Sequence, residues 1–185
     1  ADLAATFAYR TGQFLPITRV IDDQLITRNY SLASVPGLDD RLHITVKEVA
    51  GGRLSGWLVH DIGIGEPVDV APPHGRLYLA HEQPRHHLLL AAGSGIVPLY
   101  AIARYATWQA ETGGLSHRVT LVYGSREEDS ILLRDEVEAL ADRGVCRVHV
   151  LSRASEDWSV GRGLITPELL DEHWKELTAD GMDLS

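Results

Sequence analysis

The spacing of hydrophobic positions changes near residue 85 and divides the sequence into two halves. In the first half, short stretches that alternate apolar and polar residues are separated by turns rich in glycine and proline, which is the pattern of half-buried β-strands. Many short strands with a single short helix predict an antiparallel barrel. The expected strands are 13–20, 28–34, 41–49, 67–71 and 76–80, and the expected helix is 54–61.

In the second half, apolar strand-like runs alternate with stretches of helix length. This alternation predicts a parallel sheet whose strands are joined by crossover helices. The last helix has a defined start, since Thr166 can cap it, Pro167 fits its first turn and Glu168 favours the positive end of its dipole. The expected strands are 87–92, 118–123 and 146–151, and the expected helices are 97–110, 131–143 and 167–177.

We place the boundary between the halves after residue 84, which gives domains of 1–84 and 85–185. The 185 residues are 44% hydrophobic, which is enough for each domain to bury a core. A parallel sheet of this kind needs a further strand after its last helix, and the sequence ends at Ser185. The second domain is therefore expected to lack its last strand.

Charge and cysteine content exclude several function classes. The net charge of −9, without a basic cluster, argues against nucleic acid or an anionic membrane as a partner. No apolar run approaches the ~18 residues of a membrane-spanning helix. The single cysteine, Cys146, cannot form an intrachain disulfide or hold an iron–sulfur cluster by itself. Nine histidines are present, but without an HExxH motif or a cysteine pair we expect no metal site. These features indicate a cytoplasmic protein.

The stretch HLLLAAGSGIVP at 87–98 is the most informative part of the sequence. An apolar strand leads through a glycine turn into a helix, which places main-chain N–H groups and a positive dipole end around an anion. Glycines at such a turn let a pyrophosphate approach the backbone. We therefore expect a dinucleotide to bind here, although an ordinary strand-to-helix turn has the same outline. The candidate residues are Gly93, Ser94, Gly95, Ile96 and Pro98.

Five motifs occur in one order along the chain, and together they resemble the ferredoxin–NADP reductase superfamily. They are RNYSLAS at 28–34, GGRLSGWL at 51–58, the glycine turn, VYGSREEDSILLRDEVEAL at 122–140 and VLSR at 150–153. The oxygenase-reductase and flavohaemoglobin-like branches are the most similar. The resemblance implies an antiparallel Greek-key flavin-binding barrel followed by a Rossmann-like nucleotide-binding domain.

The same resemblance implies an activity. In such a flavoprotein reductase, NADPH or NADH passes hydride to FAD, and electrons then leave singly for an acceptor such as a [2Fe–2S] ferredoxin-type protein or domain. The family's C-terminal segment that meets the nicotinamide, and the first strand of its barrel, have no counterpart in the sequence. Both domains are thus expected to be incomplete at the chain ends.

The RNYSLAS motif has the chemistry that a flavin needs. Arg28 carries a permanent charge and a planar donor fork suited to phosphate. Tyr30 offers an aromatic face for the isoalloxazine and a hydroxyl for the ribityl chain. By resemblance Arg28, Tyr30, Ser31 and Leu32 bind the flavin, with Tyr30 and Ser31 beside the reacting atoms. Alternatively, Tyr30 and Leu32 alternate along a strand and simply line the barrel core.

In GGRLSGWL, the residues Gly52, Leu54 and Ser55 lie at an expected helix start. Free amides and a hydroxyl at such a position form an anion site. In the resembled family this segment holds the FAD pyrophosphate, which favours FAD over FMN. The alternative is that Ser55 is only the N-cap of the helix.

Two serine–arginine pairs, Ser125–Arg126 and Ser152–Arg153, end the second and third strands of the expected parallel sheet. Ligands of open α/β sheets bind at these carboxyl ends. We therefore assign all four residues to the nucleotide site.

Nucleotide selectivity depends on Arg153. With Ser152 it resembles the pair that holds the 2′-phosphate in NADP-selective members, so we favour NADPH. NAD selectivity would instead need a carboxylate on the ribose diol. Glu156 and Asp157 follow Arg153 closely, and Glu127, Glu128 and Asp129 follow Arg126 in the same way, which leaves NADH open.

Two rival classes fit parts of the pattern. One is a non-catalytic flavin- or nucleotide-binding subunit of a larger complex. The other is a Rossmann-like methyltransferase, which also uses a glycine turn, but the strand-rich first half and the RNYS motif argue against it.

Overall fold

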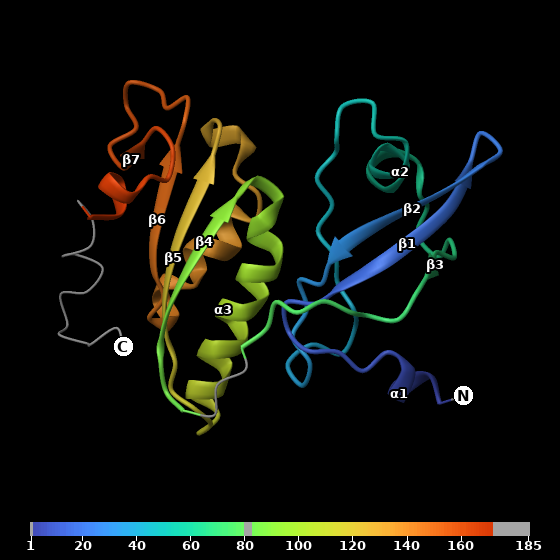
Figure 1. The fold of residues 1–185 in the computed structure, drawn as a ribbon, viewed down its shortest axis with the longest axis horizontal. Coiled ribbons are helices and arrows are strands. Elements are labelled where there is room, and N and C mark those ends of the chain that lie inside the picture. The colour runs from blue at the N-terminus through green and yellow to red at the C-terminus, as the bar shows by residue number, and fades with distance from the viewer. Residues whose placement is uncertain (1, 80–82, 172–185) are drawn as a thin grey trace.

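The computed structural model describes residues 2–79 and 83–171, and in it the chain folds into two parts that lie side by side (Figure 1). The first part contains a three-stranded sheet in the order β2-β1-β3, and the second a four-stranded sheet in the order β4-β5-β6-β7. The elements of the first part are α1 (Leu3–Thr6), β1 (Phe14–Ile21), β2 (Gln24–Ser31), α2 (Arg53–Gly56), a π-helical turn (Trp57–Asp61) and β3 (Asp69–Val70).

A long hairpin of β1 and β2 dominates the first part. Its two-residue turn, Asp22 and Asp23, has positive φ values of 50° and 56°, as a tight turn between twisted antiparallel strands requires. Ile17 and Ile26 on the inner face pack with Leu54 of α2 and Trp57 of the π-helical turn, forming a small core. The expected helix at 54–61 is confirmed, because α2 and the π-helical turn together cover Arg53 to Asp61.

Two strands expected in the first part are wrong. Segment 41–49 contributes a single bridge, Leu32 to Ile44, and residues 76–79 form no strand. Leu42 and Val49 are 40% and 62% exposed, so the alternation in this segment buries too little apolar surface to require a strand partner. The described residues thus form an antiparallel, barrel-like sheet that is not closed.

The second part confirms the expected alternation of strands and helices. Its strands run parallel, with Ala92 of β4 beside Gly124 of β5 and Ser125 of β5 beside Leu151 of β6. The elements are β4 (His86–Ala92), a 3-10 turn (Gly93–Gly95), α3 (Ile96–Glu111), β5 (Arg118–Ser125), a 3-10 turn (Glu128–Ser130), α4 (Arg134–Ala139), a 3-10 turn (Ala141–Arg143), β6 (Cys146–Leu151) and β7 (Gly161–Arg162).

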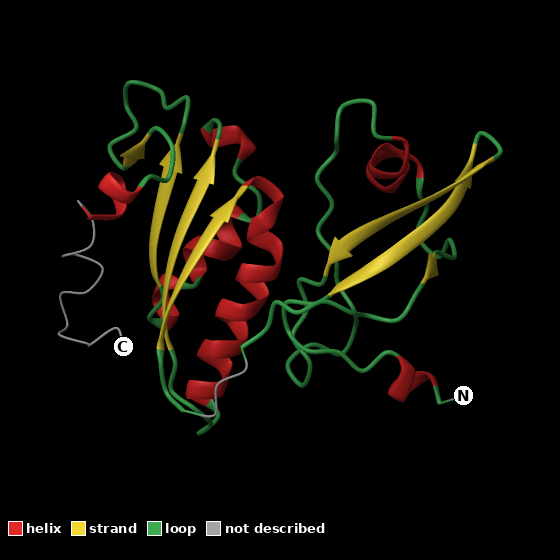
Figure 2. Ribbon diagram, in the orientation of Figure 1, coloured by secondary structure: helices red, strands yellow, loops and turns green. Residues whose placement is uncertain are grey.

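Helices cover both faces of the parallel sheet (Figure 2). On one face, Leu121 and Tyr123 of β5 pack into a large core with residues of α3 and α4. On the other face, Val122 packs with Leu169 and Leu170. Figure 1 shows α3 between the parallel sheet and the antiparallel part, so this helix joins the two.

The last helix begins as expected, since the Leu169 N–H donates to Thr166 Oγ1 at 3.3 Å. Its predicted continuation to residue 177 lies outside the described residues. The sequence did not predict the short strand β7, because a strand of two residues, one of them a glycine, carries no periodic pattern. Among the helices that the structure describes, none has the length and apolar character needed to cross a bilayer.

Candidate functional site

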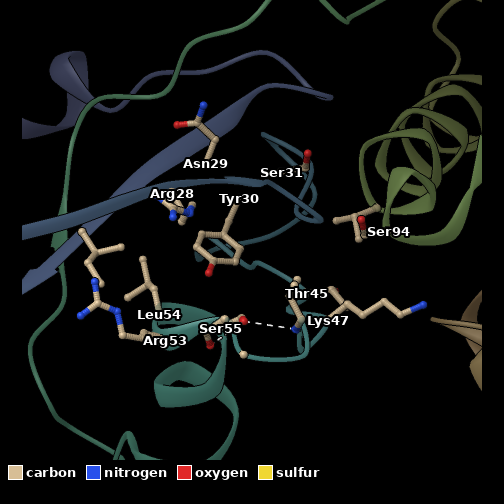
Figure 3. Close-up of a pocket in the computed structure, with 15 residues that line it drawn as sticks. Arg28, Asn29, Tyr30, Ser31, Thr45, Lys47, Arg53, Leu54, Ser55 and Ser94 are labelled. Carbon is tan, nitrogen blue, oxygen red and sulfur yellow. Dashed lines mark hydrogen bonds between the residues drawn. The ribbon is translucent and has the colours of Figure 1, made fainter. Parts of the chain in front are cut away.

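A cavity of about 420 Å³ joins three of the motifs that the sequence analysis identified separately (Figure 3). The end of β2 forms one wall, the start of α2 and the segment before it form another, and the glycine turn with α3 closes the side toward the second part. Its lining consists of Ile26, Arg28, Asn29, Tyr30, Ser31, Thr45, Lys47, Val49, Gly51, Gly52, Arg53, Leu54, Ser55, Ser94 and Val97.

Tyr30 is the aromatic side chain of this cavity. Figure 3 shows its ring projecting from β2 toward α2, with Asn29 on the opposite side of the strand. Burial raises the pKa of the Tyr30 phenol, and the charge of Arg28 only partly offsets this, so the hydroxyl is protonated at neutral pH and can donate a hydrogen bond. Arg28 is exposed and donates to the Thr27 carbonyl at 2.8 Å, which leaves most of its donors for a ligand.

The start of α2 is a tight cradle built around Gly52. This glycine is the N-cap of the helix, and a Cβ on it would lie 2.5 Å from Ser55 Oγ and 2.9 Å from the Val49 carbonyl oxygen. The Ser55 hydroxyl donates to the Gly52 carbonyl at 3.1 Å and accepts the Val49 N–H at 3.2 Å. Ser55 is therefore not the N-cap considered above. Its hydroxyl fixes the cradle, which leaves the first amides of the helix to face an anion.

Several lining residues were missed by the sequence analysis. Thr45, Lys47 and Val49 all face the cavity from the segment that was expected to be a strand. Their spacing of two is the signal that could have found them, since alternate residues of an extended segment share a face. Arg53 was also missed, and its guanidinium donates to Gln24 Oε1 at 2.7 Å, which ties α2 to the hairpin.

Some of the expected ligand residues are core residues. The side chains of Leu32 and Ile96 are 0% exposed, Leu54 is 2% exposed and Pro98 is buried. Leu32, Ile96 and Pro98 do not line the cavity, whereas Leu54 does.

The glycine turn is a single 3-10 turn that runs directly into α3. Gly93 has a φ of +52°, a region that favours glycine, and its carbonyl accepts the Tyr123 hydroxyl at 3.1 Å. The same hydroxyl accepts the Leu132 N–H at 3.1 Å, so Tyr123 connects the glycine turn to the segment before α4. A Cβ on Gly95 would meet nothing within 4 Å, so the space above this residue is open.

The two serine–arginine pairs lie next to each other at the carboxyl edge of the parallel sheet. Ser152 N–H donates to the Ser125 carbonyl at 3.0 Å, and Arg153 N–H donates to the Arg126 carbonyl at 2.8 Å. Both arginines are exposed, and Arg153 Nη1 lies 3.6 Å from Glu127 Oε1. None of these four residues lines the cavity. The glycine turn follows β4, whose end lies beside the end of β5, so the turn is at the same edge of the sheet.

Ser125 has a feature of its own. Its Oγ is buried and has no hydrogen-bond partner among the residues that the structure describes. A buried hydroxyl without a partner is costly, and a hydrogen bond to a bound group would remove that cost.

The residues present fit an FAD and a nicotinamide dinucleotide. The cavity combines an aromatic ring, the cations Arg28 and Lys47 and a glycine cradle that a Cβ would fill. The aromatic ring suits a flavin ring, and the cations and the main-chain N–H groups of the cradle suit a pyrophosphate. The open glycine turn and the adjacent arginines supply a second anion site.

Comparisons with known proteins agree with this geometry. The sequence matches the family described as oxidoreductase FAD-binding domain over residues 2–78 and that described as oxidoreductase NAD-binding domain over residues 89–184. Ferredoxin--NADP reductase B of Sorangium cellulosum is 33% identical over 172 residues, which cover 90% of this chain and 68% of that protein. The ferredoxin reductase component of 3-ketosteroid-9-alpha-monooxygenase from Rhodococcus rhodochrous is 39% identical over 152 residues, which cover 81% of this chain.

Solved structures share the fold. The CS-b5R domains of human Ncb5or in the NAD+ form superpose with a TM-score of 0.77 at 26% identity, covering 96% of this chain and 51% of that one. The flavohem-like FAD/NAD binding domain of nitric oxide dioxygenase from Vibrio cholerae has a TM-score of 0.70 at 25% identity, covering 95% of this chain and 82% of that one. The chain spans 41% of the length of the Rhodococcus reductase component.

An antiparallel flavin sheet followed by a parallel nucleotide sheet, with a cavity where they meet, defines the class of two-part flavin and nicotinamide oxidoreductases. Within that class, the chain belongs to the ferredoxin–NADP reductase superfamily. The family and the fold expected from the five motifs are confirmed.

Proposed function

We propose that the protein is an NAD(P)H-dependent flavoprotein reductase that passes hydride from a nicotinamide to FAD and then releases single electrons to an acceptor. The observation that carries this proposal is the cavity in which Tyr30 and Ser31 of β2, the α2 cradle and Ser94 of the glycine turn meet. Bound FAD would supply the redox chemistry, and the protein's contribution is binding and orientation.

On the flavin side, Arg28 and the first amides of α2 would hold the pyrophosphate. The ring of Tyr30 would pack against the isoalloxazine and its protonated hydroxyl would donate to the ribityl chain. Ser31, half-buried at the end of β2, would hydrogen-bond at the edge where the hydride arrives. Lys47 would add a second cation from the segment before α2.

On the nucleotide side, the main chain of the glycine turn would bind the pyrophosphate. NADPH is our proposed donor, because the exposed guanidinium groups of Arg126 and Arg153 follow adjacent strand ends. A 2′-phosphate would have to displace Glu127 from Arg153, and the 3.6 Å separation of these exposed side chains makes that contact weak.

The proposed partner is an electron acceptor of the [2Fe–2S] ferredoxin type, on a separate protein or domain. The single cysteine of this chain cannot provide the four ligands of such a cluster. The named relatives include ferredoxin reductase components, which supports this choice. We further propose that the two parts are separate domains divided after residue 84, and that the protein works in the cytoplasm.

Anaerobic spectroscopy on the purified protein tests the proposal. We expect flavin absorbance, and bleaching when NADPH or NADH is added. A protein that binds flavin and is bleached by dithionite but by neither nucleotide would instead be a non-catalytic binding subunit. A protein that takes up no flavin would refute the proposed site.

A further inference from the structure

Arg104 of α3 makes a two-pronged ion pair with Asp39, which belongs to the antiparallel part. Its Nη1 donates to Asp39 Oδ2 at 2.7 Å and its Nη2 donates to Asp39 Oδ1 at 2.9 Å. Nη1 also donates to the Ala33 carbonyl at 3.2 Å. The two side chains are only 18% and 14% exposed, so the pair is largely shielded from water. Parallel charge-assisted hydrogen bonds of this kind fix geometry as well as adding energy.

Asp39 organises the loop to which Arg104 binds. Its carboxylate accepts the Val35 N–H at 2.7 Å, so the segment 33–39 is folded around this one group. Hydrogen bonds from Arg104 hold the pKa of the Asp39 carboxyl below its usual value, which keeps the carboxylate charged. This segment begins two residues after Ser31, the last residue of the strand that carries the proposed flavin residues.

Arg104 is also connected to the proposed nucleotide site, because it belongs to the helix that begins at the glycine turn. α3 begins immediately after the glycine turn, and Ile102, Ala103 and Ala106 bury it against the parallel sheet with exposures of 2%, 0% and 0%. An α-helix rises ~1.5 Å per residue and does not bend easily, so fixing Arg104 fixes the turn at the helix start. The Arg104–Asp39 pair therefore links the element that carries Tyr30 to the element that carries Ser94.

We propose that Arg104 and Asp39 are positioning residues for hydride transfer, setting how the nicotinamide approaches the flavin. The inference rests on the proposed function. In the transfer, the nicotinamide gives up a hydride with its electron pair and is oxidised, and the flavin gains the same hydride and is reduced. Neither residue of the pair lines the cavity, so their effect is on alignment and not on contact with either cofactor.

The pair offers two conservative variants. Arg104→Lys keeps the charge but loses the planar fork, and Asp39→Asn keeps the shape but loses the charge. A misplacement of ~1 Å at a reacting centre can cost ~100-fold in rate. We expect either variant to slow flavin reduction at saturating NAD(P)H by about tenfold to a hundredfold, with the KM for the nucleotide and the FAD content within a few-fold of wild type.

Arg143→Lys is the matched control. Arg143 also makes a two-pronged pair, with Nε and Nη2 each 2.8 Å from a carboxylate oxygen of Glu111, but both residues lie within the second part. Its loss should leave the rate of flavin reduction unchanged.

The test is stopped-flow bleaching of the FAD-loaded full chain under anaerobic conditions, with dithionite reduction measuring bound flavin. A wild-type rate in FAD-loaded Arg104→Lys and Asp39→Asn would overturn the inference. So would variants that lose only FAD or thermal stability while each remaining flavin reacts normally. If the wild type itself is not bleached by either nucleotide, the proposed function fails and the inference fails with it.

Discussion

The substitution Gly95→Ala distinguishes a glycine turn that binds a nucleotide from one that is only structural, because the fold itself tolerates the change. Gly95 has φ −63° and ψ −12°, which any residue adopts, and a Cβ there meets nothing within 4 Å. Alanine is favoured over glycine in a helix but disfavoured at an N-cap, so the free energy of unfolding should change by less than about 1 kcal/mol.

Nucleotide binding should respond quite differently. The added methyl would occupy the open space through which a pyrophosphate reaches the amides at the start of α3. Losing one charge-assisted hydrogen bond costs about 1.5–3 kcal/mol, so affinity for NADPH and NADH should fall at least tenfold to a hundredfold.

The assay compares binding with folding in the same samples. Flavin bleaching is titrated with each nucleotide, thermal unfolding reports the fold, and dithionite confirms that the flavin is present and reducible. Gly63→Ala is the control, since its Cβ also meets nothing within 4 Å but the residue follows the π-helical turn of the antiparallel part and is not part of the glycine turn. A Gly95→Ala protein that both nucleotides reduce at the normal rate and affinity would show that the turn is structural only.

Three further changes test other parts of the argument. Arg28→Ala should weaken FAD binding by about tenfold to a hundredfold through loss of a charged phosphate contact, and full flavin occupancy with unchanged affinity after dialysis would refute the assignment. Arg153→Ala should reduce NADPH use by about one to two orders of magnitude while NADH use stays within a few-fold; a wild-type preference for NADH would refute the role and direct attention to Glu127. Because Arg104 lowers the pKa of Asp39 from 3.8, the carboxylate contributes stability that is present above that value and is lost as the pH falls through the lowered folded pKa. Urea unfolding should therefore show a gap between wild type and Asp39→Asn that is largest at neutral pH and narrows in acid, and a pH-independent gap would contradict the argument.

The parallel part was predictable from sequence because its elements are long and carry their own pattern. Strands β4, β5 and β6 were expected within two residues of their observed ends, and α3 within one. The antiparallel part was less predictable, since a short extended segment such as 41–49 alternates in the same way whether or not a partner strand lies beside it. The hairpin turn at Asp22 and Asp23 was missed, and β2 was therefore expected to begin later than it does.

By itself, the sequence determined the order of the motifs, the family and the strand-turn-helix at residues 87–98. It also supplied candidate cofactor-binding residues, and these stay predictions. These features are local, so residues within a few positions of one another carry the information. Tertiary structure alone decided that Tyr30, Gly52 and Ser94 share one cavity, that the Ser55 hydroxyl is spent within the α2 cradle, and that Arg104 reaches Asp39, 65 residues away in the chain. Such contacts depend on how two separately patterned parts dock, and no periodicity along the chain encodes which surface side chains will meet across that interface.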